Sequence, residues 1–600
     1  MLTASEPLPH WDVSGIFPSL DSPEFAAAFA RMKADVARLE ERFDSAGVRR
    51  REEGQVDAAT ASRFEEVTGA LNDLLERAGT LRAYIYAFVS TDAADEKAQA
   101  LLSEWRLAAV TLSKLETRYV AWTGSLSLEA LLERSPTARE HELYLRKAGY
   151  LAAHQMEEGE EGLSAELAPA GLSAWARLHD DMTALLTVPL ELAGERKVLP
   201  MSALRALAHS PDRGVREAAH RAELRAWKSV EVPLAAALNG IKGWQGVLRR
   251  RRRYGDDVEP TLVANSIDAE TLAAMQSACA ASFPAFRRYL RVKARALGVE
   301  RAAWFDLFAP LPGAEETQRF SWRQAEEFIE EQFSAYSPAM AAFARRSFRE
   351  SWTDAEPRAG KQGGAFCMGI VPGESRILMN FDGSFNAIAT LAHELGHAYH
   401  NLCLRECVPL RRRTPSTLAE TASIFCETLV YDAAMRAAGP DERLALLDGA
   451  LQNRLQVVVD IHSRFLFERE VFERRAGREL AAREFCELML ECERQTYGEG
   501  LDPEELHPYM WAVKSHYYGP TFYNYPYTFG LLFGLGLFRR FRCDPGAFRE
   551  GYDALLASTG LADAAALGTR FGIDTRSPDF WRGSLELIAA EIDEFARVAA

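Results

Sequence analysis

The sequence predicts a mainly α-helical protein with one small β-sheet. Apolar residues recur at steps of three and four with charged residues between them, which is the period of a helix that buries one face. The pattern first occurs at Phe25, Phe29, Met32, Val36 and Leu39. It returns in residues 70–87 and 451–472. Residues 363–381 break it, because two short apolar runs there flank Pro372 and Gly373, which is typical of a β-hairpin.

The order of these elements suggests two domains. No internal repeat of fixed period occurs, which argues against a solenoid. The acidic, glycine-interrupted residues 157–162 and the proline-bounded residues 189–200 are candidate connections. We therefore expect an N-terminal helical domain over residues 1–190 and a larger domain over residues 191–600.

Charge and composition exclude several classes of partner. With 70 Lys and Arg against 86 Asp and Glu, the net charge is −16, which disfavours binding to nucleic acid or to an anionic membrane. The basic runs 249–253 and 411–413 are interpreted as solvated helix faces or loops. No nucleic-acid, membrane or obligate protein partner is expected.

The cysteines and apolar stretches indicate a cytoplasmic protein. The 8 cysteines form no Cys-x-x-Cys pair and no disulfide framework, which favours reduced thiols. Residues 1–10 lack the basic and apolar regions of an export signal. No apolar run reaches the length of a membrane span.

One helix carries a metal-binding motif. Ser384 or Asn386 can cap a helix that continues through His393, Glu394 and His397. The two histidines are four residues apart and project from one face, where they can bind one ion. Glu394 lies about 100° around the helix and can reach a metal-bound water. This H-E-x-x-H pattern predicts a zinc site.

A catalytic zinc ion takes three protein ligands, so a third must follow. The metzincin pattern would place a third histidine at position 403, but this sequence has Cys403 there, so that class is excluded. His400 is interpreted as a packed residue. The next helical stretch offers Glu420 and Glu427, seven residues apart on one face. Glu420 is the expected ligand; Glu427 is the alternative, or a partner for an imidazole N–H.

A later stretch is rich in phenols and imidazoles. Attack of water on a peptide carbonyl creates an oxyanion, and His516 with Tyr523 or Tyr527 could donate hydrogen bonds to it. The two tyrosines share a helical face if the proline between them lies in a first turn, whereas Tyr525 points away. An aromatic core is the alternative interpretation.

Taken together, these motifs resemble the oligoendopeptidase F family, zinc metallopeptidases related to thimet oligopeptidase, over nearly the whole chain. The resemblance is carried by residues 11–17, 393–397 and 419–423, and by His516 with residues 522–527.

The resemblance implies a bowl-like, zincin-type helical fold with a deep substrate channel. It also implies that His393, His397 and Glu420 bind one zinc ion per chain and that Glu394 is the catalytic carboxylate. Short peptides would be its substrates, and the cytosol its location.

The expected function is that of a zinc-dependent endopeptidase, which hydrolyses internal bonds of short oligopeptides by attack of a zinc-bound water. Glu394 would take the proton of that water, and His516 with a tyrosine would stabilise the oxyanion. The edge of the hairpin could align substrate as an added strand. Two alternatives stay open: an exopeptidase resembling dipeptidyl carboxypeptidases, and a zinc-dependent peptide-binding protein without turnover.

Overall fold

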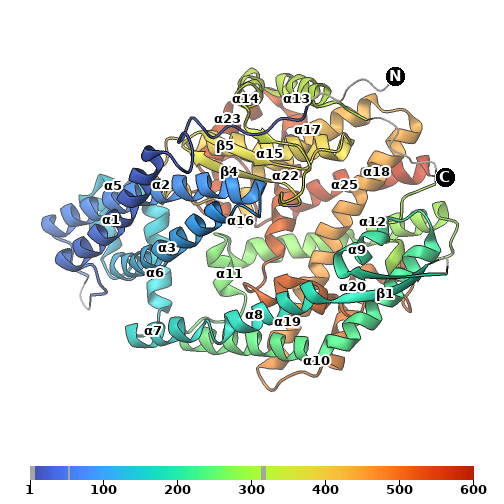
Figure 1. Ribbon diagram of the computed structural model, residues 1–600, viewed down its shortest axis with the longest axis horizontal. Helices are drawn as coiled ribbons and strands as arrows, with labels where there is room; N and C mark the ends of the chain where they lie inside the picture. The colour runs from blue at the N-terminus through green and yellow to red at the C-terminus, as the bar shows by residue number, and fades with distance from the viewer. Residues whose placement is uncertain (1–6, 52–53, 193, 313–318, 600) are drawn as a thin grey trace. The chain divides into compact units, whose positions relative to one another are not determined.

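The computed structural model describes residues 7–51, 54–192, 194–312 and 319–599. The chain packs into two compact units, each assembled from three separate stretches (Figure 1). The first unit consists of Met1–Gln155, Gln318–Ala434 and Arg540–Ile573, and the second of Met156–Thr317, Met435–Arg539 and Asp574–Ala600. This division follows spatial packing and not the order of the sequence. It therefore does not test the domain boundary expected near residue 190, which stays a prediction.

The first unit is mainly helical and contains a small sheet. Its helices are α1 (Pro23–Ala46), α2 (Ala58–Thr91), α3 (Glu96–Thr123), α4 (Leu128–Arg134), α5 (Pro136–Glu140), α6 (Glu142–His154), α13 (Trp322–Tyr336), α14 (Pro338–Arg349), α15 (Phe385–Cys403), α16 (Ser416–Ala419), α17 (Thr421–Ala437), α23 (Pro545–Ala557) and α24 (Ala564–Arg570). Its strands are β3 (Thr353–Asp354), β4 (Phe366–Val371) and β5 (Glu374–Leu378).

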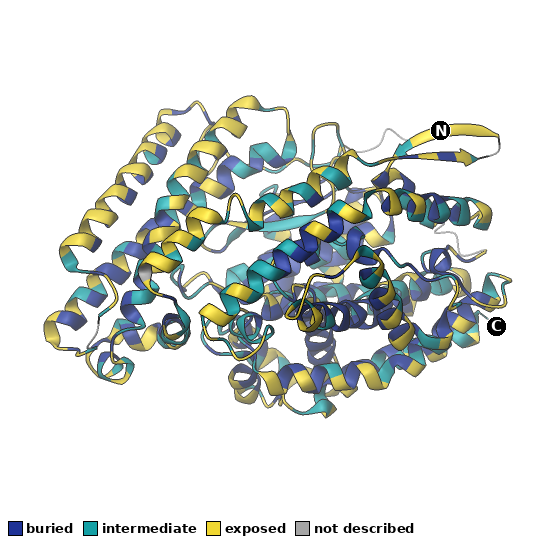
Figure 2. Cartoon of the chain, turned by 90° about the horizontal axis from the view of Figure 1, so that it is seen from below, coloured by how far each residue is buried: buried dark blue, intermediate teal, exposed yellow. Residues whose placement is uncertain are grey.

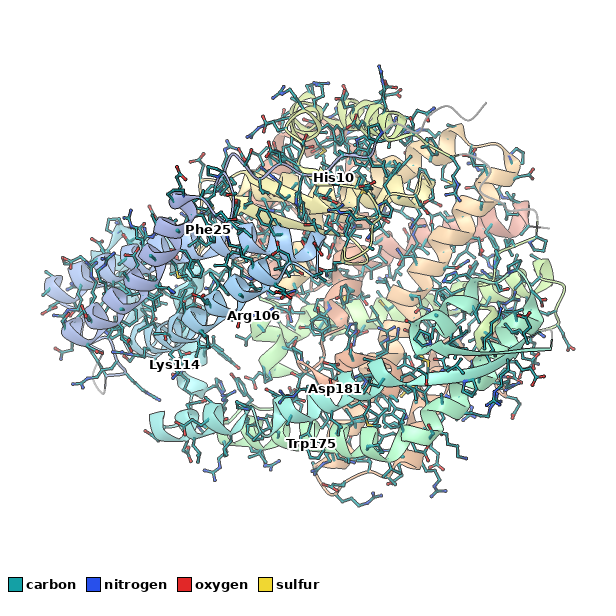
Figure 3. All side chains as sticks on the ribbon, in the orientation of Figure 1. His10, Phe25, Arg106, Lys114, Trp175 and Asp181 are labelled. Atoms are coloured by element: carbon teal, nitrogen blue, oxygen red, sulfur yellow. The ribbon has the colours of Figure 1, made fainter. Side chains whose placement is uncertain are left out.

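Helix α1 shows why the helical period predicts the fold. The Ser22 hydroxyl accepts a hydrogen bond from the N–H of Phe25, and Gly47 ends the helix with φ at 64°. The apolar residues of the predicted stripe are all buried. Phe25, labelled in Figure 3, is one of them. In Figure 2 the helices accordingly show buried residues on one side and exposed residues on the other.

The predicted hairpin forms the small sheet of the first unit. Strand β5 lies in the middle, antiparallel to β4 and parallel to β3. Gly373 adopts a φ of 77° in the turn, which glycine accepts without strain. The amide of Asn401 in α15 donates to the Ser375 hydroxyl at 3.0 Å, which joins that helix to the sheet.

The second unit is also mainly helical. Its helices are α7 (Glu158–Leu167), α8 (Leu172–Leu185), α9 (Met201–Ala206), α10 (Arg213–Arg251), α11 (Glu259–Ala264), α12 (Ala269–Ala296), α18 (Pro440–Leu455), α19 (Ile461–Arg475), α20 (Ala482–Tyr497), α21 (Met510–Val513), α22 (Tyr525–Cys543) and α25 (Pro578–Val598). Its strands are β1 (Thr187–Leu192) and β2 (Glu195–Pro200). The mainly α-helical fold class is confirmed.

The hairpin of β1 and β2 is not predicted by the sequence, which marks residues 189–200 only as a connection. The two strands pair antiparallel from Thr187 opposite Pro200. Among the described residues of this hairpin, Val188 and Leu190 alone are buried, and Val198 is exposed. The apolar alternation that predicts a strand is therefore too short here to be recognised.

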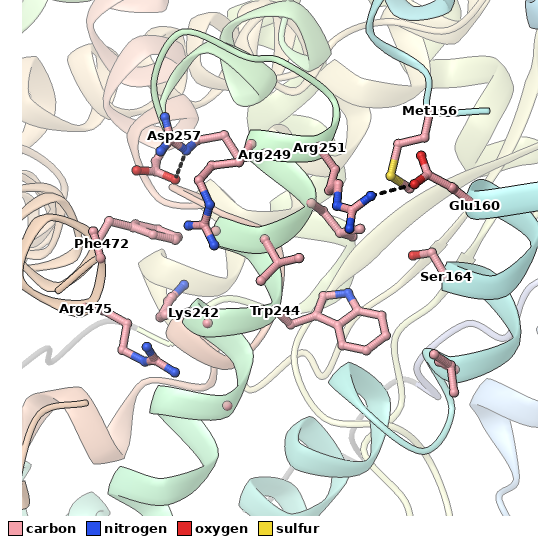
Figure 4. A pocket seen from close by; sticks show the side chains of 18 of the residues that line it. Met156, Glu160, Ser164, Lys242, Trp244, Arg249, Arg251, Asp257, Phe472 and Arg475 are labelled. Atoms are coloured by element: carbon pink, nitrogen blue, oxygen red, sulfur yellow. Dashed lines mark hydrogen bonds and ion pairs between the residues drawn. The ribbon is translucent and has the colours of Figure 1, made fainter. Parts of the chain in front are cut away.

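A cavity of about 500 Å³ lies in the second unit and is lined mainly by α7, α10 and α19 (Figure 4). Arginines of the basic run 249–253 line this cavity, among them Arg249 and Arg251. Arg249 lies 3.0 Å from Asp257, and Arg251 lies 2.6 Å from Glu160. These arginines thus form ion pairs within the unit.

Two further sequence expectations concern the membrane and the thiols. Among the described residues, no helix combines the length and the apolar character needed to cross a bilayer. All the cysteines, including the buried Cys279 and Cys426, are free thiols.

Helices α15 and α17 pack very closely at Gly396, within the H-E-x-x-H motif. A Cβ atom placed there would lie 2.6 Å from the Cα of Ser423 and 2.7 Å from the carbonyl oxygen of Ala422. The two helices therefore touch almost backbone to backbone.

We expect Gly396→Ala to lower the free energy of unfolding by about 1–3 kcal/mol, because the helices must separate. Urea denaturation measures the change. Gly449→Ala is the matched control: this glycine lies in α18, where an added Cβ would have nothing within 4 Å, and alanine there should stabilise the helix by up to about 1 kcal/mol. Equal destabilisation of both variants would contradict the packing argument.

Candidate metal centre

Helix α15 presents the H-E-x-x-H motif from a buried position. The Ser384 hydroxyl accepts the N–H of Ala387 at 3.1 Å, so Ser384 rather than Asn386 caps the helix. Its apolar stripe, which includes Ile388 and Leu395, is fully buried. The rings of His393 and His397 lie on one face with their centroids 4.9 Å apart, as four-residue spacing predicts.

Glu420 lies between α16 and α17, and its side chain meets both histidines. Its carbonyl accepts the N–H of Ile424 at 3.1 Å, so it stands at the first turn of α17 and not within that helix. Its Oε2 atom lies 3.2 Å from Nε2 of His393 and 3.3 Å from Nε2 of His397. The structure thus brings the three expected ligand residues together.

The three donor atoms fit a divalent metal ion. A tetrahedral ion with bonds of about 2.0 Å has its ligands about 3.3 Å apart, which matches both spacings. Burial lowers the pKa of His393, but contacts with Glu420 and Glu427 outweigh it and raise that pKa to about 10. This carboxylate environment favours a cation, and two imidazoles with one carboxylate are a donor set that zinc accepts.

Glu427 orients one of the imidazoles. The Nδ1–H of His393 donates to Oε2 of Glu427 at 2.9 Å, so in the neutral ring Nε2 would be the atom that binds a metal ion. Of the two roles open for Glu427, the geometry matches that of a partner for an imidazole N–H. Ser423 is a contributor that the sequence reasoning missed: its hydroxyl donates to Oε2 of Glu420 at 2.6 Å. Its position three residues after Glu420 was the available signal.

Two polar residues beside the ligand histidines on α15, Glu394 and His400, are buried. Glu394 is 6% exposed, and burial raises its pKa, so its carboxylate is a better proton acceptor than one in water. His400 bonds through Nε2 to the Thr559 hydroxyl at 2.8 Å, and burial lowers its pKa to about 4. His400 is therefore a packed residue outside the donor group, as predicted.

In the second unit, the structure brings together His516, Tyr523 and Tyr527. The ring of His516 lies 4.9 Å from that of Tyr523 and 6.4 Å from that of Tyr527. The Tyr527 hydroxyl donates to the Tyr523 hydroxyl at 3.3 Å. Tyr525 points away, as predicted, and its buried hydroxyl donates to the carbonyl of Thr261 at 3.1 Å.

Asn524 fixes the tautomer of His516. Its Oδ1 atom accepts from Nη1 of Arg464 at 3.1 Å and from Nδ1 of His516 at 2.6 Å. The Nδ1 atom of His516 therefore carries a proton, and in the neutral ring Nε2 is an acceptor. Burial lowers the pKa of His516, so the neutral form predominates at pH 7. His516 can donate through Nε2 only in its cationic form.

Phe522 shapes the backbone before this group. Its φ of 49° is rare for a large side chain. Its ring is buried against Phe465 at 5.1 Å and Phe472 at 5.7 Å, and this packing holds the unusual conformation. The turn leaves Tyr523 and Tyr527 exposed at the start of α22.

Curated relatives match much of this chain at low identity. An oligoendopeptidase F homolog of Lactococcus lactis is 24% identical over 65% of this chain. The matched part spans 65% of that relative's length. The group B oligopeptidase PepB of Streptococcus agalactiae is 22% identical over 89% of this chain and 90% of its own.

A solved structure shares the fold. The crystal structure of oligoendopeptidase-F from Enterococcus faecium superposes with a TM-score of 0.69 at 18% identity, over 96% of this chain and 98% of that chain. Residues 206–587 match the family described as Peptidase family M3. This region contains each residue described in this subsection. The chain therefore belongs to peptidase family M3, and its sequence resemblance to the metallopeptidases of the oligoendopeptidase F group is confirmed.

Proposed function

We propose that the protein is a zinc-dependent endopeptidase that hydrolyses internal bonds of short oligopeptides. One observation carries the proposal: two imidazole nitrogens and a carboxylate oxygen converge at 3.2 and 3.3 Å beside the buried carboxylate of Glu394. Membership of peptidase family M3 supports it, as does similarity to proteins named oligoendopeptidase F and oligopeptidase.

In the proposed mechanism His393, His397 and Glu420 would hold one zinc ion. When bound, zinc supplies a Lewis acid and lowers the pKa of water. Glu394 accepts the proton of the attacking water, because burial has raised its proton affinity. The same carboxyl group then passes that proton to the leaving amine.

Tyr523, Tyr527 and His516 are proposed to stabilise the oxyanion. A phenolic O–H donates at any pH below its ionisation, so either tyrosine can serve. His516 donates through Nε2 once it has gained a proton, since Asn524 already holds its other N–H. These residues belong to the second unit and the zinc ligands to the first.

Substrate alignment is proposed to use the hairpin. Strand β4 stands at the edge of the sheet order β3, β5, β4, so its outer backbone groups can pair with an extended peptide. Backbone pairing gives affinity with little dependence on side chains. We therefore propose broad sequence tolerance, within the channel that the family resemblance implies.

The free thiols support a reducing, cytoplasmic location. Short peptides are the proposed partners, and the lack of nucleic-acid, membrane and obligate protein partners stays a prediction. An exopeptidase, which needs a cation for a substrate terminus, stays the alternative; of the run 411–413, Arg412 contacts Glu76 and Arg413 lies 2.9 Å from Glu116.

We expect Glu394→Gln to reduce kcat by about 10²–10⁴-fold while zinc stays bound, because the amide cannot accept a proton. Mass spectrometry of a mixed-length peptide digest and metal analysis measure the two effects. Glu406→Gln, at an exposed carboxylate after α15, is the control. Full turnover by Glu394→Gln would refute its role, and stepwise terminal trimming by the wild type would refute the endopeptidase assignment.

Glu427→Gln should weaken zinc binding by about 10–100-fold, since the tautomer of His393 would lose its carboxylate partner. Competition with a chromophoric chelator measures the affinity, again with Glu406→Gln as the control. An unchanged affinity would show that Glu427 does not act through His393.

Asn524→Asp should raise the pKa of His516 by about one unit, because a carboxylate would then face Nδ1. The donating cationic form is lost as pH rises through that pKa, so the fall of kcat/KM should move to higher pH in the variant. A pH–rate profile measures the shift. Gln245→Glu, which changes an amide bonded to Gly519 in the same unit, is the control. An unshifted profile would contradict donation by His516.

A further inference from the structure

A second convergence of imidazoles and a carboxylate lies within the second unit. His220 and Glu223 are three residues apart on one face of α10, and His507 lies in the segment before α21. One donor atom of each lies within 4.8 Å of the others. Unlike the partly exposed donors of the first unit, all three side chains are buried, with exposures of 4%, 7% and 0%.

Three of the four imidazole nitrogens of this group lack hydrogen bonds. Among the described residues, Nε2 of His220 and both ring nitrogens of His507 have no hydrogen-bond partner. The Nε2 atom of His507 lies 3.3 Å from Oε1 of Glu223, but the ring is not oriented to donate to it. Buried polar atoms are costly when unpaired, so these nitrogens indicate a missing ligand.

Aromatic rings lie beside both imidazoles. The ring of Phe305 lies 5.5 Å from that of His220, and the ring of Trp304 lies 5.7 Å from that of His507. The two imidazoles themselves are 5.4 Å apart, centroid to centroid. These aromatic rings cannot supply the strong hydrogen bonds that an imidazole nitrogen makes.

We propose that His220, Glu223 and His507 bind a second zinc ion. Two imidazole nitrogens and a carboxylate oxygen are zinc donors, whereas magnesium and calcium prefer oxygen alone. The 3.3 Å between His507 and Glu223 matches the edge of a tetrahedron with bonds of about 2.0 Å. The sequence predicts one zinc ion per chain; the second group raises the number to two.

Neighbouring side chains hold two of these ligands in place. Trp227 donates to Oε1 of Glu223 at 3.1 Å, and Arg205 contacts the same oxygen, so a cation would meet some repulsion from Arg205. Glu493, which is 1% exposed, accepts the backbone N–H of His507 through its Oε2 at 3.1 Å.

A zinc ion at this group would have three protein ligands, and a water molecule would complete its tetrahedron. The ligands are buried, so no peptide can reach the ion, and the ion would join α10 to the segment before α21 within one unit. Its contribution is then to stability rather than to turnover.

Zinc stoichiometry tests the proposal without depending on activity. The double variant His393→Ala/His397→Ala removes the donors of the first group and leaves the second intact. After exchange into zinc-free buffer, elemental analysis should find two zinc ions per wild-type chain and one per chain of the double variant. A folded double variant that holds no zinc after incubation with Zn²⁺ would overturn the proposal. A wild type with one zinc ion that the double variant retains would instead overturn the first group and support the second.

A further variant assigns the retained ion to its ligands. Adding His507→Asn to the double variant should abolish binding of the remaining zinc ion. When Co²⁺ replaces zinc, the visible absorption of the four-coordinate ion should also disappear. Adding zinc should no longer raise the Tm. His462→Asn is the matched control, because His462 is buried in the same unit against Phe283 and is not one of the three proposed ligands. Zinc retained after His507→Asn would overturn the assignment. Should that variant unfold, titration of the double variant with Zn²⁺ and Co²⁺ alone decides.

Discussion

The close approach of α15 and α17 is the constraint on which the first unit depends. The close approach at Gly396 brings Glu420, which directly precedes α17, within reach of the two histidines of α15. Other contacts also position α15. The hydroxyl of Tyr399 donates to Asp553 at 2.8 Å and His400 bonds to Thr559, so α23 and its following turn hold the helix in place.

Local signals made much of this arrangement predictable. A serine cap, histidines at helical spacing and a Pro-Gly turn each specify a few neighbouring residues, so the H-E-x-x-H helix and the hairpin could be placed from the sequence. The choice between Glu420 and Glu427 was less secure, because both fit the same face. It depends on where α17 begins: Glu420 precedes the helix and reaches both histidines, while Glu427 contacts only the Nδ1 side of His393.

Other features depend on backbone geometry or on distant contacts. The bond between His516 and Asn524 requires the turn at Phe522, whose left-handed conformation no propensity predicts for phenylalanine. The group of His220, Glu223 and His507 joins segments far apart in the chain, and an H-x-x-E pair on a helix is too common to indicate a metal. The proximity of His507 to that pair is visible only in the tertiary structure.

The interleaved order of the two units has a consequence for biosynthesis. Each unit is assembled from three stretches, so neither can fold as a continuous N-terminal domain during translation. Helix α15 emerges from the ribosome well before α23, which covers it. At the usual rate of synthesis its apolar surface stays uncovered for on the order of ten seconds. The nascent chain thus exposes apolar surface of the kind that chaperones bind.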